Sequence, residues 1–345
     1  MPDADRQRAQ KGGNGSPNIN WEEKMNKRTL ILAAFTMLAA QTYTALADDR
    51  PTIPVIVKDT TSFYWQIVLA GARSAGKEFN VNVPELGAQS EGDIAGQISI
   101  LENAVAGKPA AIVISPTQFS ALGKPIDMAA KSTKVIGIDG SADTKSFTSF
   151  LGTDNIAGGA AAADALAEGV KQKTGKIEGD VAALTNIAGQ DSGDRRVKGF
   201  VDEIKAKYPG LNVVANKVAD GQATTALNNM NDLITAYPKL VGVFANALVM
   251  GQGAGQALAE NKAQNRITLV SFDSDDKTVK MLSDGIIYAL AVQNPFREGH
   301  DAVEIALDAS RGKSTPSNID TGVTVITKAD MDTDASKALL SPKVN

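Results

Sequence analysis

Residues 110–138 read AAIVISPTQFSALGKPIDMAAKSTKVIGI, and this stretch decides the fold class. It opens with an uninterrupted apolar run at residues 110–114 and closes with a second run at residues 135–138. The segment between them is long enough for a helix. Short apolar runs separated by helices are typical of parallel strands that are buried on both faces. The stretch therefore predicts a strand, a crossover helix and a second, parallel strand.

The same alternation repeats along the chain. Between most of the apolar runs, apolar residues recur at helical spacing, as in Ile94, Ile98, Leu101 and Val105. Strands are predicted at residues 52–58, 81–85, 110–114, 135–138, 147–151, 180–184, 213–217, 241–245, 267–272, 286–292 and 323–327. We therefore expect an α/β protein with doubly wound parallel sheets.

The chain divides into two similar halves near residues 152–155. Asp154 and Asn155 are predicted to cap a helix over residues 156–173. No low-complexity linker separates the halves, which favours two lobes joined by short crossovers over two independently tethered domains.

The composition excludes several classes of protein. The chain has 345 residues, 43% hydrophobic and 21% charged, as expected for a folded chain of about two domains. A net charge of -4 argues against a nucleic-acid-binding protein, whose footprint is basic. The sequence has no Cys and a single His, His300, which excludes thiolate chemistry, Cys-ligated zinc and multi-histidine metal sites. We expect neither a cofactor nor a metal ion.

Residues 1–47 are predicted to be absent from the working protein. Lys27 and Arg28 precede an uncharged apolar run at residues 30–40, and Ala45 and Ala47 occupy positions suited to signal cleavage before residue 48. A bilayer span needs about 20 apolar residues, so a cleaved secretory signal is favoured over a membrane anchor. Residues 21–24 can be encoded by a ribosome-binding sequence, which makes Met25 the predicted start. We expect a periplasmic protein.

Polar side chains follow several of the predicted strands. Asp139 follows the strand at residues 135–138, Asp273 follows residues 267–272, and Gln293 follows residues 286–292. Arg196 ends the loop after residues 180–184. Ligands of open α/β sheets sit beyond the carboxyl ends of strands, and these groups can form paired hydrogen bonds with hydroxyls.

Aromatic residues make up 5% of the chain, yet Phe63, Tyr64 and Trp65 stand together directly after Ser62 and the first strand. A helix cannot bury three consecutive side chains on one face. A flat ring covers the C–H face of a sugar, so the trio indicates a sugar or polyol site, with Phe63 expected to be the ring in the core.

Structural roles compete with these interpretations. Asp139 and Asp273 could cap helices, and Arg196 could be a surface charge or hold a structural carboxylate. His300 is predicted to be structural. The glycines at 251, 253 and 255 lack the full G-x-G-x-x-G spacing of a dinucleotide loop and are predicted to lie within a helix.

The order of short motifs is more specific than any one of them. The motifs are Tyr64-Trp65, Gly71, ISPT at 114–117, VIGID at 135–139, TDNIAGG at 153–159, RVKGF at 196–200, VFAN at 243–246, SFD at 271–273, AVQNP at 291–295 and TGVTVIT at 321–327. Together they resemble the periplasmic sugar-binding proteins of the ribose-binding type, the extracytoplasmic receptors of ABC importers. The resemblance covers nearly all of the chain after residue 47.

The resemblance implies a type I periplasmic-binding fold, in which three strands form a hinge between two lobes. The hinges would lie near residues 153–154, 293–294 and 322–323. Lobe one would comprise residues 48–153 and 294–322, and lobe two would comprise residues 154–293 and 323–345.

The resemblance also implies a ligand site shared by the lobes. Lobe one would supply Ser62, Tyr64, Trp65 and Asp139, and lobe two would supply Arg196, Asn246, Asp273 and Gln293. Two positions depart from the family pattern: Gly140 stands where ribose binders carry Arg, and Ala247 follows Asn246 where the family commonly has Asp. Both departures favour a different pentose, a hexose or a linear polyol over ribose.

We therefore expect a monomeric solute-binding protein that closes on a sugar or sugar alcohol and is recognised by a membrane permease. A role in handing the closed form to a chemoreceptor or kinase is compatible with this. Two rival classes are a lactose-repressor-like regulator and a secreted sugar-active enzyme. The regulator would need a DNA-binding segment within residues 1–47, where the sequence indicates an export signal instead.

Overall fold

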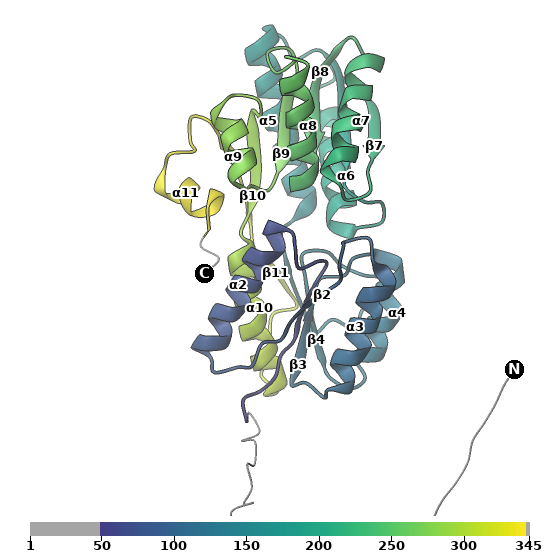
Figure 1. Cartoon of the computed structure of the whole chain (residues 1–345), viewed down its shortest axis with the longest axis vertical. Coiled ribbons are helices and arrows are strands. Elements are labelled where there is room, and N and C mark those ends of the chain that lie inside the picture. The colour runs from purple at the N-terminus through teal and green to yellow at the C-terminus, as the bar shows by residue number, and fades with distance from the viewer. Residues whose placement is uncertain (1–48, 343–345) are drawn as a thin grey trace, which may run out of the picture. The chain divides into compact units, whose positions relative to one another are not determined.

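The computed structural model describes residues 49–342, and Figure 1 shows them as two lobes, each built on one sheet. The predicted signal segment and the predicted start at Met25 lie outside the described residues. Across residues 49–342, none of the helices combines the length and hydropathy that a bilayer crossing requires.

The sheet of lobe one has six strands in the order β11-β5-β4-β3-β1-β2, and all of its pairings are parallel. Its strands are β1 (Val55–Val57), β2 (Glu85–Gly87), β3 (Ala111–Ile114), β4 (Lys134–Ile138), β5 (Ser149–Gly152) and β11 (Asn318–Asp320). Its helices are α2 (Phe63–Glu78), α3 (Ile94–Ala106), α4 (Phe119–Ala129) and α10 (Pro295–Ser310). Helices α2 and α10 pack on one face, and α3 and α4 pack on the other.

The sheet of lobe two has the order β12-β10-β9-β8-β6-β7, in which only the β10–β12 pairing is antiparallel. Its strands are β6 (Gly179–Thr185), β7 (Leu211–Val218), β8 (Leu240–Ala245), β9 (Thr268–Phe272), β10 (Ala289–Gln293) and β12 (Val323–Thr327). Its helices are α5 (Asn155–Thr174), α6 (Asp191–Lys207), α7 (Ala223–Ala236), α8 (Leu248–Glu260), α9 (Asp276–Ser283) and α11 (Asp334–Leu340). Helices α5 and α6 cover one face, while α7, α8 and α9 cover the other. The predicted two-lobed, doubly wound α/β fold is confirmed.

Strands β3, β9 and β10 are buried along their whole length, which is why their apolar runs identify them in the sequence. Two predictions need correction. The strand predicted at residues 81–85 lies at Glu85–Gly87, because Asn82 makes only an isolated bridge with Thr52 and Pro84 has no N–H to donate. Strand β11 was not predicted, since it is a short edge strand without an apolar run.

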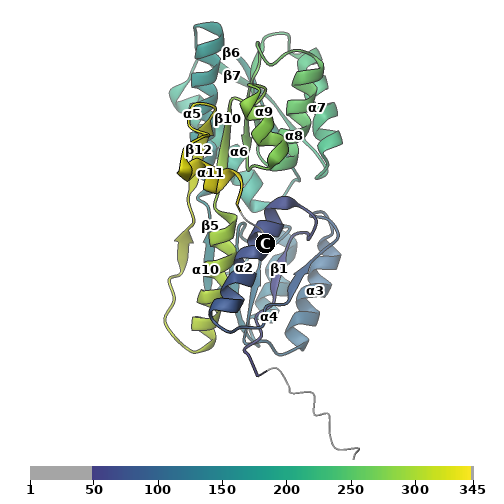
Figure 2. The ribbon, with the colours of Figure 1, turned by 60° about the vertical axis from the view of Figure 1, so that its left-hand side comes forward.

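The chain passes between the two sheets three times. The crossovers follow β5, β10 and β11, and Figure 2 shows β10 and β12 in one lobe with α10 in the other. Two of the crossovers are bonded together: the Thr153 hydroxyl donates to the Gly322 carbonyl at 3.0 Å, and the Asp154 N–H donates to Asp320 Oδ1 at 3.1 Å. Asp154 also caps α5, as predicted, by accepting from the N–H groups of Ile156 and Ala157.

Pairs of glycines bring one helix pair in each lobe close together. A Cβ on Gly71 in α2 would lie 2.0 Å from the Phe296 carbonyl oxygen, and one on Gly299 in α10 would lie 1.9 Å from the Val68 carbonyl oxygen. Gly159 and Gly199 play the same part between α5 and α6. Because real Cβ atoms do not approach oxygen so closely, these helix crossings require glycine.

Candidate functional site

A cavity of about 380 Å³ lies where the two lobes face each other, and residues of both lobes line it. Its volume is in the lower part of the range for small-molecule sites. All eight residues predicted for the ligand site line it: Ser62, Tyr64, Trp65, Asp139, Arg196, Asn246, Asp273 and Gln293. The structure therefore brings the predicted residues together, while their contact with a ligand remains a prediction.

Asp139 lies at the centre of a buried charged cluster. Its Oδ2 accepts from Lys58 Nζ at 2.6 Å and from the Ser192 hydroxyl at 3.1 Å. Its Oδ1 lies 3.7 Å from Arg196 Nη2. Burial opposes ionisation, but the charges of Lys58 and Arg196 outweigh it and lower the pKa of Asp139. Asp139 is therefore a charged hydrogen-bond acceptor at neutral pH.

Arg196 connects the acidic residues of the two lobes. Besides Asp139, its guanidinium lies 3.9 Å from Asp273 Oδ2 through Nη1 and 4.1 Å above the Phe272 ring. Its Nε donates to Asn155 Oδ1 at 2.7 Å, and Nη1 donates to the Asn246 carbonyl at 3.1 Å. Among the described residues, buried Nη2 has no hydrogen-bond partner. Because Arg196 lines the cavity, Nη2 can donate to a bound oxygen.

The pKa of Asp273 is shifted in the opposite direction to that of Asp139. Asp273 accepts from Gln293 Nε2 at 2.8 Å, and burial raises its pKa to about 6 despite the Arg196 charge. The oxygen of the Gln293 amide, Oε1, is buried without a hydrogen-bond partner among the described residues. Neither Asp139 nor Asp273 caps a helix; Asp275 is the cap of α9.

The aromatic trio is arranged differently from the prediction. Tyr64 and Trp65 are the two rings buried in the core of lobe one, whereas Phe63 is half-buried at the cavity. Helix α2 begins at Phe63, and Tyr64 and Trp65 share the inward face with Val68. The expectation that Phe63 is the core ring is therefore wrong. The Tyr64 and Trp65 rings meet edge to face at 4.8 Å.

Asn246 and Ser62 also line the cavity, and the side chain of Asn246 is held by hydrogen bonds. Asn246 is fully buried; its Oδ1 accepts from the Asn186 N–H at 2.9 Å and its Nδ2 donates to the Gly193 carbonyl at 3.2 Å. Ser62 precedes α2 without making a side-chain cap, and its N–H donates to Asp59 at 2.7 Å. Asn246 thus connects the loop after β6 and the first turn of α6 at the cavity wall.

Lys58 was not among the predicted site residues, because these were taken from the positions that follow each predicted strand. It is the last residue of the predicted strand at 52–58, and a buried lysine at a strand's carboxyl end is itself a signal for a site. Its side chain brings a cation to Asp139, next to Gly140. A Cβ on Gly140 would lie 3.4 Å from the Ser192 N, in van der Waals contact with the first turn of α6.

Glu91 was also missed, and its carboxylate bridges the two lobes. Oε1 accepts from Trp65 Nε1 at 2.7 Å within lobe one. Oε2 accepts from Asn186 Nδ2 and Gln190 Nε2, both at 3.0 Å and both in lobe two. We call this group, Glu91 with Asn186 and Gln190, the interlobe clasp. Glu91 lies in the polar loop after β2, which was predicted too early in the chain, so it was not recognised as a residue that follows a strand.

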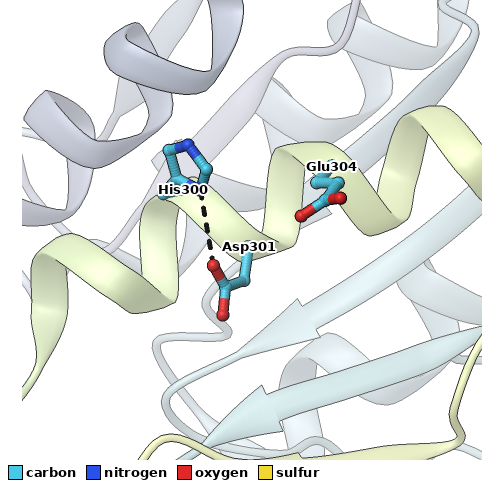
Figure 3. Close-up of side chains that lie close together, drawn as sticks. All are labelled: His300, Asp301 and Glu304. Carbon is cyan, nitrogen blue, oxygen red and sulfur yellow. Dashed lines mark hydrogen bonds and ion pairs between the residues drawn. The ribbon is translucent and has the colours of Figure 1, made fainter. Parts of the chain in front are cut away.

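Two other sequence features lie outside the cavity. Gly251, Gly253 and Gly255 are within α8, as predicted, where each approaches a neighbouring element closely. His300 on α10 lies beside Asp301 and Glu304, as Figure 3 shows. Its Nδ1 is 3.3 Å from Asp301 and its Nε2 is 3.0 Å from Glu78 of α2, so both ring nitrogens are engaged. We assign no metal ion to His300, Asp301 and Glu304.

Comparison with known proteins agrees with this architecture. Residues 53–314 match the family model of the periplasmic binding protein domain. The ribose import binding protein RbsB of Salmonella typhimurium is 27% identical over 290 residues, covering 84% of this chain and 94% of that protein. The D-ribose/D-allose-binding protein of Pseudomonas aeruginosa is 24% identical over 310 residues, covering 85% of this chain and 94% of that protein.

Solved structures agree as well. A carbohydrate transporter solute binding protein from Agrobacterium Radiobacter, in complex with D-arabinose, is 61% identical with a TM-score of 0.84, covering 85% of this chain and 99% of that one. An ABC transporter solute binding protein from Agrobacterium vitis with bound D-fucose is 33% identical with a TM-score of 0.79, covering 84% and 99%. The chain belongs to the periplasmic binding protein family, as a sugar-binding protein of the ribose-binding type.

Proposed function

We propose that the chain binds a monosaccharide, D-arabinose first among the candidates, between its lobes and presents it to the permease of an ABC importer. The observation that carries this proposal is Arg196, which is buried between Asp139 and Asp273. Its Nη2 lacks a hydrogen-bond partner among the described residues. The choice of a pentose is supported by the relative with 61% identity that was solved with D-arabinose.

In this proposal the sugar hydroxyls donate to the carboxylates of Asp139 and Asp273 and accept from Arg196 and Lys58. Gln293 Oε1, which is unpaired among the described residues, accepts from a further hydroxyl. Phe63 and Trp65 supply apolar contact for the C–H face of the ring. Each hydrogen bond to a charged group contributes about 1.5–3 kcal/mol, so a few of them are enough for tight binding.

Closure follows from the division of the site between the lobes. A sugar that contacts Asp139 of lobe one and Arg196 of lobe two has higher affinity for the closed state than for the open state. The two lobes rotate about the three crossovers, and the interlobe clasp forms as they meet. The permease then recognises the closed form.

The same proposal extends to location, assembly and chemistry. The chain is exported to the periplasm by the segment that ends at Ala47, acts as a monomer, and releases its sugar unchanged. Incubating D-arabinose with the protein and separating the products by chromatography tests the last point. Any conversion of the sugar would favour the enzyme alternative.

Thermal-shift screening followed by calorimetry tests the ligand. The panel contains D-arabinose, L-arabinose, D-ribose, D-fucose, D-allose and xylitol. At 100 times Kd, a ligand that binds only the folded protein stabilises it by about 2.7 kcal/mol, which raises Tm by several degrees. We expect the largest rise with D-arabinose. A panel without any rise would contradict the proposed function, and a larger rise with xylitol would replace the pentose by a sugar alcohol.

A further inference from the structure

Behind the cavity floor lies a buried carboxyl group that the proposed binding mechanism does not use. Glu298 is in the first turn of α10 and is 1% exposed. It is not among the residues that line the cavity. Both of its oxygens nevertheless hold residues that do: Oε1 accepts from the main-chain N–H of Asp139, and Oε2 is 3.0 Å from the Tyr64 hydroxyl.

We propose that Glu298 is a positioning residue for sugar binding, which holds Asp139 and Tyr64 from behind and must keep its own proton for tight binding. The inference rests on the proposed function, because it concerns affinity for the sugar. It goes further in assigning a role to a residue that does not touch the ligand.

Glu298 supports the main chain of Asp139. Asp139 has a φ of 59°, in the left-handed region that residues with a Cβ rarely adopt. Its N–H is shared between the Leu151 carbonyl, at 3.0 Å, and Glu298 Oε1. These two acceptors hold the conformation that directs the Asp139 carboxylate toward Lys58 and Ser192. Without Glu298, Asp139 keeps one acceptor in place of two.

Glu298 also holds Tyr64 through a hydrogen bond. The Tyr64 side chain is 7% exposed and reaches from α2 to Glu298, which is on α10. The Tyr64 ring supports Trp65 edge to face, so the hydrogen bond also fixes the aromatic wall of the cavity. A single carboxyl group thus links the acidic floor to the aromatic wall.

The protonation state of Glu298 depends on its buried surroundings. The titratable groups that face Glu298 are Tyr64 from α2, Asp139 from the end of β4 and Lys58 from the end of β1. Burial, followed by the negative charge of Asp139, raises the pKa of Glu298 to about 8, while its hydrogen bonds and Lys58 act in the opposite direction. At neutral pH Glu298 is therefore mainly protonated. Its Oε1 still accepts from Asp139, and the protonated Oε2 shares a hydrogen bond with Tyr64.

Ionisation of Glu298 should weaken sugar binding. Ionised Glu298 would place a second negative charge behind Asp139. A bound sugar expels water from the cavity, which strengthens that repulsion, so the sugar binds better to the form with protonated Glu298. A group whose pKa rises on binding supports full affinity at low pH, and the affinity falls as the pH rises through about 8.

The test is calorimetric titration of D-arabinose between pH 6 and 9.5 with four proteins: the parent, Glu298→Gln, Glu298→Leu and Glu304→Gln. Glu304 is exposed on the same helix and is the matched control. Glutamine keeps an acceptor for Asp139 and a donor for Tyr64 but cannot ionise. Leucine removes both hydrogen bonds.

We expect the parent and Glu304→Gln to lose at least about 3-fold in affinity between pH 7 and 9.5. Glu298→Gln should match the parent at pH 7 and stay flat to pH 9.5. Glu298→Leu should bind about 10-fold more weakly at pH 7. Persistence of the alkaline loss in Glu298→Gln, a flat parent profile, or parent-like affinity in Glu298→Leu would overturn the inference.

These measurements distinguish a failure of the proposed function from a failure of the proposed role of Glu298. If the parent binds no sugar of the panel at pH 7, the proposed function fails. If the parent binds and the Glu298 variants follow it at every pH, the role of Glu298 alone fails. Should Glu298→Leu not fold, the comparison of Glu298→Gln with Glu304→Gln still decides the matter.

Discussion

Asp139 and Asp273 occupy equivalent positions in the two lobes. Each follows a central strand, β4 or β9, with positive φ values of 59° and 62°. Each donates its N–H to a carbonyl of the next strand, Leu151 at 3.0 Å and Ala291 at 2.8 Å. The two carboxylates thus face each other across the cavity with Arg196 between them. Four predictions follow from this arrangement and from the packing that supports it.

Replacing Arg196 by Ala should weaken D-arabinose binding by at least about 10-fold, because one hydrogen bond to a charged group contributes about 1.5–3 kcal/mol. The substitution also leaves the buried carboxylate of Asp273 without its cation and Asp139 with Lys58 alone, so the ligand-free protein should melt at a lower temperature. Calorimetry and thermal denaturation measure the two effects. Arg195→Ala, an exposed neighbour on the same helix, is the control and should change neither. Unchanged affinity in Arg196→Ala would show that the site is misplaced.

Replacing Asp273 by Asn should stabilise the ligand-free protein at pH 7 while weakening sugar binding. The folded-state pKa is raised from 3.8 to about 6, so ionised Asp273 costs at most roughly 3 kcal/mol above pH 6. This cost is absent below about pH 4, where the carboxyl group is protonated in both states. Chemical denaturation at pH 7 and pH 4 measures the difference.

The control for Asp273→Asn is Asp332→Asn, whose side chain is 89% exposed. It should leave the free energy of unfolding nearly unchanged at both pH values. A loss of stability in Asp273→Asn at pH 7 would mean that attraction to Arg196 exceeds the effect of burial.

Replacing Glu91 by Ala should destabilise the closed state, because the interlobe clasp and the Trp65 indole lose their acceptor. We expect affinity to fall about 10-fold, mainly through faster dissociation, as is common for interface substitutions. Stopped-flow displacement measures the dissociation rate, and small-angle X-ray scattering measures the opening of the ligand-free protein. Glu102→Ala, exposed on α3, is the control. Equal dissociation rates in the two variants would exclude a role for the clasp in closure.

Replacing Gly159 by Ala should destabilise the protein by about 1–3 kcal/mol, because the new Cβ collides with the main chain of α6. That Cβ would lie 2.0 Å from the Arg196 carbonyl oxygen, so sugar affinity should fall as well. Thermal denaturation and calorimetry provide both values. Gly92→Ala is the stability control, since a Cβ there meets nothing within 4 Å. A variant as stable as the parent would show that α6 can shift without cost.

Sequence reasoning found the strands because a strand buried on both faces must be apolar, whichever strands lie beside it. The strand at residues 110–114 is an example: every residue of β3 is buried. It also found Asp139, Asp273 and Gln293, because parallel topology places the carboxyl ends of strands at one edge. It missed β11, whose pairing with β5 depends on main-chain hydrogen bonds rather than on side-chain pattern.

The pairing of polar groups around the cavity was decided by the tertiary structure alone. Lys58 and Asp139 are 81 residues apart, Glu91 and Asn186 are 95 apart, and Asp139 and Glu298 are 159 apart. No local periodicity connects such positions. The sequence determined which groups would stand at the strand ends, since that depends on local hydrophobic pattern. Which of them are neutralised, which stay unpaired toward the cavity and which keep a proton depends on distance and burial, and these exist only after the lobes have folded and met.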